Sequence, residues 1–365
     1  MELKQLTHWL RSRDFREKQA CIGFDGFVDR VLRVVDKRLD NQNVTYVKTL
    51  SDYGQMLMDA AGLSLNIELM PSALKLGGNG PIMANAIAAF GSPVSCLGAF
   101  GLPSVEPIFS ELANRAELYS FSQPGHTDAY QFDDGKIIAS VLQPLNDLNW
   151  ECLEKHIGLE KLEQLFDKAD LIAMNNWTMI PCMTAMWKNL QKQIFPKLSS
   201  KTRTIFIDLA DPSKRMVEDL REALETMKDL TAFGRVLLSC NLREAVQIAG
   251  VLGIDHVGKD AEELCRSIQT SLGIHIVSVH TLKNATYCED GESKTVDGFY
   301  TQTPKISVGG GDHFNAGLAV GIMNGLPLND ALLLGNAVSG YYVRTGESPS
   351  AERVADFLSS YLKED

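Results

Sequence analysis

The chain has little positive charge and no long apolar run. It carries 35 Lys and Arg against 46 Asp and Glu, giving a formal net charge of -11. This balance argues against a nucleic-acid partner or an anionic membrane surface, both of which are bound by clustered basic residues. No apolar run approaches a membrane span, and the N-terminus lacks the charged-then-apolar layout of a signal peptide. The sequence therefore predicts a soluble, cytoplasmic protein without nucleic-acid or membrane partners.

The cysteines lack any paired spacing. There are seven of them, an odd number, scattered along the chain and never in a CxxC arrangement. Neither a disulfide framework nor a zinc site is indicated, and most of these thiols are expected to be small core residues. Internal repeats, low-complexity tracts and linkers are also missing. With 45% hydrophobic residues, the chain can bury one large core, and we expect residues 1–365 to form a single domain.

What the sequence does contain, after residue 150, is a steady alternation of helical and strand-like segments. Strands separated by helices of this length imply βαβ units and an α/β fold, a doubly wound, mainly parallel sheet with helices on both faces. The expected strands are residues 171–174, 204–208, 236–240 and 274–280, and the expected helices are residues 153–166, 184–193, 217–227, 243–249, 261–271, 330–344 and 354–362.

The first half of the chain follows a different pattern. Period-two alternation appears in residues 31–35, 44–47 and 65–70, and again on both sides of a break at residues 133–135, which is typical of a hairpin. These segments predict a smaller sheet added to the body. Residues 82–90 and 106–115 are expected to be helices.

Three glycines followed by Asp312 open an apolar segment, residues 314–323. Glycines before a helix leave amide N–H groups open, and with the helix dipole the amides of Gly309, Gly310 and Gly311 can bind phosphate or a developing oxyanion. Asp312 could accept the proton of an attacking hydroxyl, or it could be an ordinary helix N-cap. The stretch alone does not decide between these two interpretations.

Polar residues also follow a buried strand near the N-terminus. Asp25 and Asp29 come after residues 20–24, at a strand end where open α/β sheets usually bind ligands. They could hold polyol hydroxyls, or they could be a turn former and a solvated charge. Farther along, Gly77 and Gly78 form a tight loop with Asn79, whose amide suits sugar hydroxyls or, alternatively, a turn with positive φ.

Two later strand ends carry polar groups. Asn241 and Glu244 lie one helical turn apart and could hold magnesium through water, although these residues alone favour an ordinary N-cap with a partner three residues on. Thr281 could contact a nucleotide phosphate or simply end a strand.

Taken together, these motifs resemble the PfkB or ribokinase-like carbohydrate kinases over nearly the whole chain. The resemblance depends on four motifs in the same order: Gly77-Gly78-Asn79-Gly80, Asn241-Leu242-Arg243-Glu244, Gly309-Gly310-Gly311-Asp312 and Asn336-Ala337. It implies a ribokinase-like α/β domain with a small β-sheet lid, here residues 30–50, 64–75 and 118–145. It also implies ATP as phosphoryl donor, Mg²⁺ as the metal, a sugar as substrate and a homodimer formed through the lid.

The resemblance also implies roles for individual residues. Asp312 would be the catalytic base, and the amides of residues 309–311 would stabilise the transferring phosphoryl group. The remaining roles are sugar binding by Asp29 and Asn79, with Asp25, Gly77 and Gly78 beside them; nucleotide binding by Thr281, Asn336 and Gly311; and metal binding by Asn241 and Glu244.

Several positions depart from the family pattern. Ile82 replaces an expected asparagine, and Ile306 stands where the family often has an aspartate that serves a monovalent cation. A potassium requirement is therefore doubtful, although Gly346 and Ser350 resemble the rest of that cation loop. His313 follows the expected base; it could tune Asp312 or contact substrate, but an exposed residue at the start of a helix is the favoured interpretation. Lys283 stands where the nucleotide loop often has glycine.

The resulting hypothesis is an ATP-dependent, magnesium-requiring kinase that phosphorylates a hydroxyl group of a small carbohydrate. A nucleoside kinase of the same family is one alternative, and it would need an aromatic partner for the base, with Phe27, Tyr130 and Phe132 as candidates. A catalytically weak sugar sensor is another alternative, suggested by Ile82 and Ile306.

Overall fold

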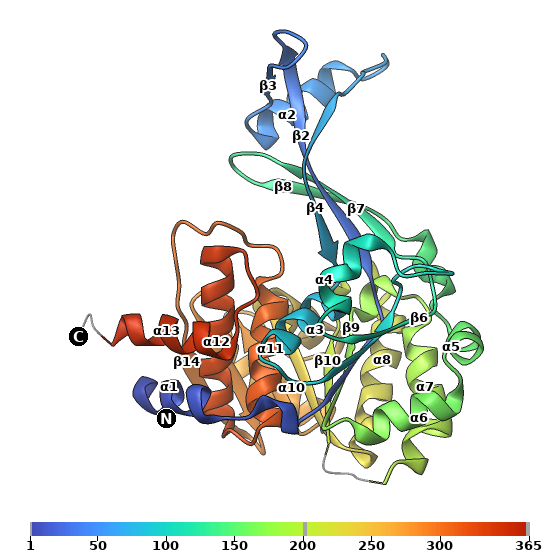
Figure 1. Cartoon of the computed structure of the whole chain (residues 1–365), viewed down its shortest axis with the longest axis vertical. Helices are drawn as coiled ribbons and strands as arrows, with labels where there is room; N and C mark the ends of the chain where they lie inside the picture. Colours follow the sequence, from blue (N-terminus) through green and yellow to red (C-terminus); the bar gives the residue numbers. More distant parts are fainter. Residues whose placement is uncertain (1, 200–202, 363–365) are drawn as a thin grey trace.

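In the computed structural model, which describes residues 2–199 and 203–362, a nine-stranded sheet forms the centre of the body (Figure 1). Its strands are β1 (Ala20–Gly23), β5 (Val94–Gly98), β6 (Glu117–Ser120), β9 (Leu171–Asn175), β10 (Thr204–Asp208), β11 (Arg235–Asn241), β12 (Ile276–His280), β13 (Asn284–Glu289) and β14 (Glu292–Asp297). Their order is β14-β13-β12-β11-β10-β9-β1-β5-β6. All neighbours from β6 to β12 are parallel, while β13 and β14 add an antiparallel edge.

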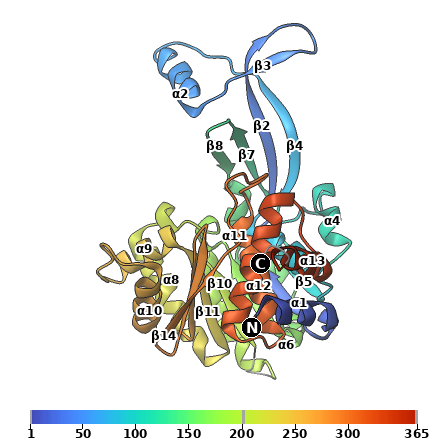
Figure 2. The same cartoon turned by 90° about the vertical axis from the view of Figure 1, so that its left-hand side faces the viewer.

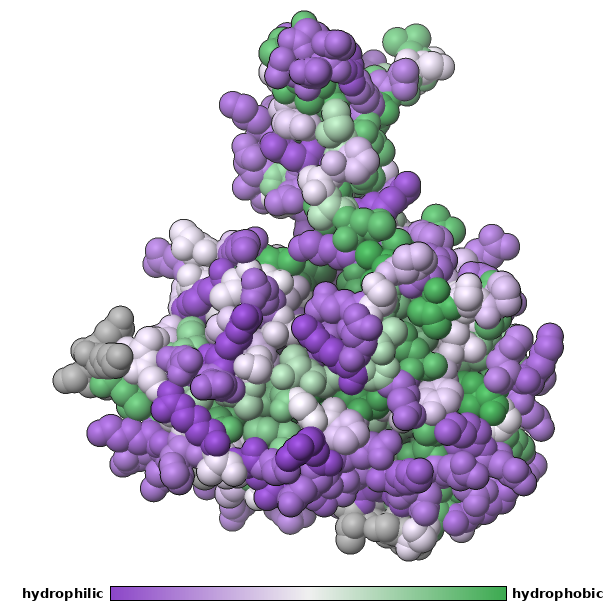
Figure 3. All heavy atoms as spheres, in the orientation of Figure 1, coloured by the Kyte–Doolittle hydropathy of each residue, from purple (hydrophilic) through white to green (hydrophobic). Residues whose placement is uncertain are grey.

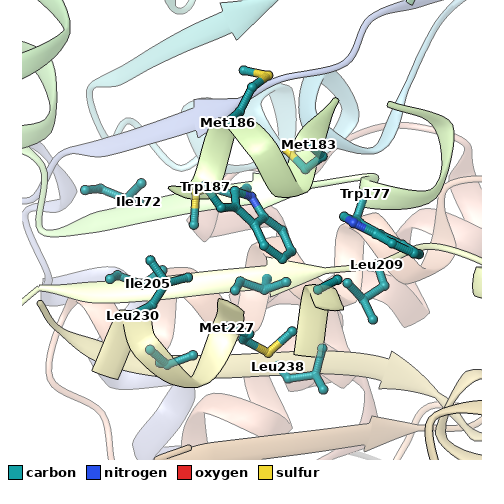
Figure 4. Close-up of a cluster of buried hydrophobic side chains, with 14 of the residues drawn as sticks. Ile172, Trp177, Met183, Met186, Trp187, Ile205, Leu209, Met227, Leu230 and Leu238 are labelled. Carbon is teal, nitrogen blue, oxygen red and sulfur yellow. The ribbon is translucent and has the colours of Figure 1, made fainter. Parts of the chain in front are cut away.

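Both faces of this sheet are covered by helices because its strands are apolar on both sides. In β10, Ile205 and Ile207 belong to one buried cluster and Phe206 to the other, as the period of two in a strand requires. The first cluster packs under α5 (Trp150–His156), α6 (Leu159–Lys168), α7 (Met183–Gln193), α8 (Val217–Asp229), α9 (Leu242–Val251) and α10 (Ala261–Leu272). Figure 4 shows part of it, where Trp187 lies between α7 and the sheet.

The second cluster packs under α1 (Leu3–Ser12), α3 (Asn79–Ala89), α4 (Ser110–Ala113), α11 (Gly310–Met323), α12 (Leu328–Thr345) and α13 (Ala351–Tyr361). Helices α11 and α12 approach closely, since a Cβ added to Gly317 would lie 2.8 Å from the Cα of Gly335. This contact holds the middle of α11 against α12. Short 3₁₀ helices complete the body: Phe15–Glu17, Pro107–Phe109, Gln143–Asp147, Trp177–Met179, Phe195–Lys197, Pro212–Lys214 and Leu230–Ala232.

A second sheet projects from the body, and we call it, with its helix, the arm (residues 27–77 and 125–141). It contains β2 (Phe27–Arg38), β3 (Val44–Tyr46), α2 (Leu50–Asp59), β4 (Leu69–Gly77), β7 (Gly125–Gln131) and β8 (Lys136–Val141). Strand β2 is central, pairing with β3, β4 and β7, and it follows β1 after only residues 24–26. Figures 1 and 2 show the arm extending well beyond the body, with β3 and α2 at its far end.

The arm has a small core of its own. Val34, Val47, Tyr53 and Phe132 are buried together, and Tyr53 packs on Phe132 with ring centroids 5.3 Å apart. Hydrophobic side chains nevertheless remain visible along the arm and where it joins the body (Figure 3). The exposed large apolar residues of the arm are Leu39, Leu57, Met58, Leu63, Leu65, Leu74, Ile138 and Val141.

The predicted alternation of helices and strands after residue 150 is confirmed, as is the doubly wound, mainly parallel sheet. One predicted helix, residues 153–166, is divided into α5 and α6 because Gly158 adopts a φ of 82° between them. The strand expected at residues 65–70 instead begins at Leu69 and runs to Gly77, paired with β2. The helix expected at residues 106–115 is reduced to a 3₁₀ turn and the four residues of α4. Across the described residues, no helix combines the length and hydropathy needed to span a bilayer.

Candidate active site

Polar side chains gather where the parallel strands of the body end. Strands β1, β9, β10, β11 and β12 all end at the same edge of the sheet, and the N-terminus of α11 lies beside that edge. Asp208 is the last residue of β10, Asn241 of β11 and His280 of β12. Ligands of open α/β sheets bind at such an edge, so this is the candidate active site.

The glycine turn opens α11. Gly309 is the N-cap residue with a φ of 85°, the left-handed conformation that glycine adopts without strain, and the helix begins at Gly310. Asp312 is therefore in the first helical turn and is not the cap, which removes the simpler of the two explanations of this residue. Its side chain is largely buried, with 8% exposed.

The environment of Asp312 favours its protonated form. Burial raises the pKa of this carboxyl well above its ordinary value, and the negative charges of Asp208 and Asp25 raise it further. A hydrogen bond with the side chain of Asn79 acts in the opposite direction. A carboxylate in such surroundings gains more from accepting a proton than an exposed one does.

Asp25 contacts the start of α3. Its Oδ2 accepts hydrogen bonds from the Asn79 amide at 2.9 Å and from Asn176 Nδ2 at 2.7 Å, and its Oδ1 accepts one from the Gly80 amide at 2.8 Å. Asn79 is the first residue of α3, after Gly78 as N-cap with a φ of 97°, so it does not lie in the loop as expected. Both oxygens of Asp25 thus hold the first turn of α3, which carries Asn79.

Asp29 lies at the base of the arm. It is directly opposite Lys75 of β4 and Thr127 of β7, so all three side chains are on one face of the arm sheet. Burial raises the pKa of Asp29 to about 6, and a hydrogen bond from Thr127 and the charge of Lys75 lower it. Gly77 leaves room for this carboxylate, since a Cβ added there would lie 2.3 Å from Asp29 Cγ.

A cavity of about 660 Å³ lies between this face of the arm and the body. We call it the arm cavity. Asp29 and Lys75 line it from the arm, and Ile82, Ser307 and Tyr342 line it from the body. Its size suits a small organic ligand.

A second cavity, of about 750 Å³, lies along the end of β12, and we call it the edge cavity. It brings together Gly311, Thr281, Asn336 and Asn241 from separate parts of the chain. Thr281 also accepts hydrogen bonds from the amides of residues 283 and 284 in its own turn, and Asn336 Nδ2 donates to two carbonyls of β14, so both side chains are held in place. Pro304 and Ser307 line both cavities.

Asn241 and Glu244 form a reciprocal capping pair at the start of α9. Asn241 Oδ1 accepts from the Glu244 amide at 3.0 Å, and Glu244 Oε2 accepts from the Asn241 amide at 2.9 Å. Burial raises the pKa of Glu244 to about 8, and the nearby charge of Asp208 contributes to this rise. Among residues 2–199 and 203–362, no three histidine, cysteine, aspartate or glutamate side chains are arranged as a direct metal site.

Two expectations about side chains need correction. His313 is not exposed: only 1% of it is accessible, because α12 packs over it and Tyr342 stacks on its ring at 3.5 Å. Of the aromatic candidates for stacking on a base, Phe27 lies in the body core, and Tyr130 and Phe132 pack on Tyr53 within the arm.

Other residues at the site were missed by sequence reasoning. Asp208 is buried and accepts a hydrogen bond from Asn315 Nδ2 at 2.7 Å; its place at the end of a predicted strand was the available signal. Lys136 of β8 reaches from the arm to Ser307 Oγ at 3.4 Å, and burial lowers the pKa of its ammonium group. No local pattern indicated this contact, since 171 positions separate the two residues.

The chain is similar to known proteins over nearly its whole length. The model of the prokaryotic ketohexokinase family matches residues 11–361. A ketohexokinase from Haloferax volcanii is 30% identical over 348 residues, covering 94% of this chain and 92% of that protein. Among solved structures, an Arabidopsis thaliana ribokinase complexed with ribose and ATP has a TM-score of 0.65 at 16% identity, covering 94% of this chain and 98% of that one. An adenosine kinase from Sinorhizobium meliloti has a TM-score of 0.66 at 15% identity, covering 96% and 100%. These structural likenesses show the ribokinase fold and confirm that part of the resemblance.

The hydrogen bond to Asp29 gives a testable prediction. Thr127→Val removes the donor that lowers the pKa of Asp29, so this pKa should rise above about 6. Because the folded-state pKa is raised, the contribution of Asp29 to stability is present below its unfolded pKa and is lost as the pH rises through the folded pKa. The substitution should therefore raise the pH at which this contribution is lost. Carboxyl ¹³C NMR titration measures the shift, and Thr127→Ser, which keeps the hydroxyl, is the control. An unchanged Asp29 titration in Thr127→Val would contradict the assigned contact.

Proposed function

Because the chain belongs to the prokaryotic ketohexokinase family, we propose that it transfers the terminal phosphoryl group of ATP to a hydroxyl group of a ketohexose. It is a carbohydrate kinase, a phosphotransferase with an alcohol group as acceptor. The type of reaction, phosphoryl transfer to an alcohol group, follows from membership of this family. The residues that perform the reaction, and the ligands they bind, are the proposals that follow.

One observation supports the assignment of roles above all others: the two cavities share a wall just before the glycine turn. Pro304 and Ser307 line both, while Gly310 and Gly311 border the edge cavity and Val308 borders the arm cavity. A donor in one cavity and an acceptor in the other would therefore meet beside Gly309–Asp312. Phosphoryl transfer requires this kind of positioning more than covalent chemistry by the protein.

We assign the edge cavity to ATP. Thr281 and Asn336 line it, as do Gly310 and Gly311 at the N-terminus of α11. Open amides at a helix N-terminus, together with the helix dipole, favour phosphate oxygens. The amides of Gly309, Gly310 and Gly311 are our proposed anion hole for the transferring group.

We assign the arm cavity to the sugar, with Asp29 and Asn79 as its hydrogen-bonding partners and Gly77 and Gly78 as close backbone neighbours. Asp25 contributes indirectly by holding the first turn of α3, which carries Asn79. The segments 30–50, 64–75 and 118–145 would serve as the lid over this cavity, excluding the water that competes as phosphoryl acceptor.

In the proposed step, the sugar oxygen attacks the γ-phosphorus of ATP. A new O–P bond forms, the bond between the γ-phosphorus and the oxygen of ADP breaks, and the hydroxyl proton passes to Asp312. The raised pKa of Asp312 suits a group that must accept a proton during the step.

The residues present fit a divalent cation held through water. Glu244 and Asp208 are buried carboxylates whose charges oppose each other, and Asn241 lines the edge cavity beside them. A cation would relieve this opposition, and Mg²⁺ commonly binds through one or two protein groups with waters and phosphates. We therefore propose Asn241 and Glu244, with Asp208, as its holders. When bound, Mg²⁺ neutralises charge on the phosphate oxygens.

The two alternatives fare differently. A nucleoside acceptor is less well supported, because the family model and the curated relative are ketohexokinases. Phe27 and Tyr130 pack away from the arm cavity, although Phe132 lines it. The sugar sensor differs from the kinase in turnover alone: sugar binding without ADP release under any magnesium or potassium condition would favour it. The seven free thiols and the proposed use of ATP fit a cytoplasmic protein.

The role of Asp312 is tested by Asp312→Asn. This variant keeps the shape of the side chain but cannot accept the proton, so kcat should fall by about 10²- to 10⁴-fold. Its affinity for ADP, measured by isothermal titration calorimetry, should change little. Asp229→Asn, the same change on an exposed residue at the end of α8, is the control and should retain full activity. Retained turnover in Asp312→Asn would rule out the assigned base.

We expect turnover without potassium. Lys305 Nζ donates to the carbonyl of Thr345 at 2.8 Å, at the carboxyl end of α12 and beside Gly346. This ammonium group supplies a fixed positive charge at the negative end of the helix dipole, so kcat in sodium and potassium buffers should agree within about twofold. Coupled ADP-release assays measure this, and activation of the wild type by potassium of more than about tenfold would refute the expectation.

We also propose a homodimer formed through the arm, because the arm exposes Leu57 and Met58 at 46% and 72%. Sedimentation should give about twice the monomer mass of 40.2 kDa. Leu57→Lys with Met58→Lys should yield monomers. Val257→Lys, at a body position that is 83% exposed, should remain dimeric. A wild-type monomer at micromolar concentration would exclude the proposed dimer.

A further inference from the structure

Three consecutive carbonyls of the glycine turn are each held by a side chain. Val308 O accepts from Tyr342 Oη at 2.9 Å, Gly309 O from His313 Nδ1 at 2.7 Å, and Gly310 O from Ser339 Oγ at 2.9 Å. Tyr342 and Ser339 belong to α12, whereas His313 belongs to α11. The turn is thus fixed from two helices at once.

These contacts determine where the amides point. In a planar trans peptide the C=O of one residue and the N–H of the next point in opposite directions. Holding the carbonyl of Val308, Gly309 or Gly310 therefore fixes the direction of the amide of Gly309, Gly310 or Gly311, respectively. The three side chains thereby orient the three amides of the proposed anion hole.

The bond from His313 has a defined polarity. The carbonyl of Gly309 can only accept, so the ring proton must be on Nδ1. The other nitrogen, Nε2, then accepts from Ser348 Oγ at 2.9 Å. The backbone amide of His313 donates to the same Gly309 carbonyl at 3.0 Å. One residue therefore holds this oxygen with two donors.

The surroundings keep the ring neutral and fixed. Tyr342 stacks on it with an interplanar angle of 11°, and the His313 side chain is buried. Burial lowers the pKa of His313 to about 4, while its bond to Gly309 acts in the opposite direction. Ser348 also accepts from Asn85 Nδ2 at 3.4 Å, and Asn85 Oδ1 accepts from Arg115 at 3.1 Å. These hydrogen bonds thus form a continuous chain in which every donor points the same way, from Arg115 at the surface to the Gly309 carbonyl.

We propose that His313 is a positioning residue for phosphoryl transfer: its Nδ1–H holds the Gly309 carbonyl and so directs the Gly310 amide toward the transferring phosphoryl group. The Gly310 amide makes only a long bond of 3.4 Å to Ser307 O, which leaves it available to a phosphoryl oxygen. Without the ring donor, only the backbone amide of His313 holds the Gly309 carbonyl. The peptide between Gly309 and Gly310 is then less firmly fixed, because glycine tolerates many backbone conformations. This inference rests on the kinase function proposed above.

Two substitutions separate positioning from packing. His313→Phe keeps a flat ring against Tyr342 but loses the donor, and kcat should fall by about 10- to 100-fold, with the KM values for sugar and ATP changed by less than about threefold. His313→Asn can donate from a nitrogen near the position of Nδ1 and should recover most of kcat. A purely structural role would instead lower the melting temperature of both variants and leave kcat per folded molecule unchanged.

A spectroscopic measurement tests the contact without any substrate. In ¹⁵N NMR spectra of the free, full-length protein, His313 should be the neutral tautomer protonated on Nδ1. Finding the Nε2-protonated tautomer, or a wild-type kcat in His313→Phe, would overturn the inference. If the wild type released no ADP with any ketohexose, the proposed function would fail, which is a different outcome from equal turnover by wild type and His313→Phe.

Discussion

Repulsion among buried carboxylates is the constraint around which this site is arranged. Asp25, Asp208, Glu244 and Asp312 come together because parallel strands end at one edge of a sheet and α11 begins beside it. Burial raises the pKa of each of them. Hydrogen-bond donors offset this cost. Asp25 accepts three hydrogen bonds from protein groups, and Asp208 accepts one from Asn315 and one from the Ala210 amide. The remaining excess of negative charge favours a cation and a proton-accepting role.

The amides at the start of α11 favour a negatively charged group, whereas the carboxylates favour a positive one. The amides and Asp312 lie within one helical turn. Gly309 to Gly311 present N–H groups, and Asp312 follows immediately. An anion and a developing proton can be handled side by side because rigid elements hold both groups. Helix α12 supplies that rigidity by packing on α11 through Gly317 and Gly335. The packing of α12 on α11 thus keeps the amides and the carboxylate of Asp312 next to each other.

Much of this could be predicted from sequence because it is local. The glycine turn, the capping pair of Asn241 and Glu244, and the strand end before Thr281 all depend on residues a few positions apart. Asp29 was expected just after the end of a strand, but it lies inside β2. What escaped prediction depends on distant contacts. His313 looked like an exposed helix start until Tyr342, 29 positions later, covered it. Lys136 and Ser307 meet only because a hairpin in the arm reaches the body. Strand β4 was placed too early because the apolar and polar residues of its sequence do not alternate regularly. Its position is set by its pairing with β2.

The length of β2 has a mechanical consequence. Its twelve residues at about 3.3 Å each make a lever of roughly 40 Å. Its fixed end is β1, which it follows after three residues. A rotation of about 10° at this fulcrum would carry the tip near Arg38 through about 6 Å but would move Asp29, two residues from the base, by only about 1 Å. If the arm acts as the proposed lid, its outer part would therefore travel several times farther than the carboxylate of Asp29 at its base.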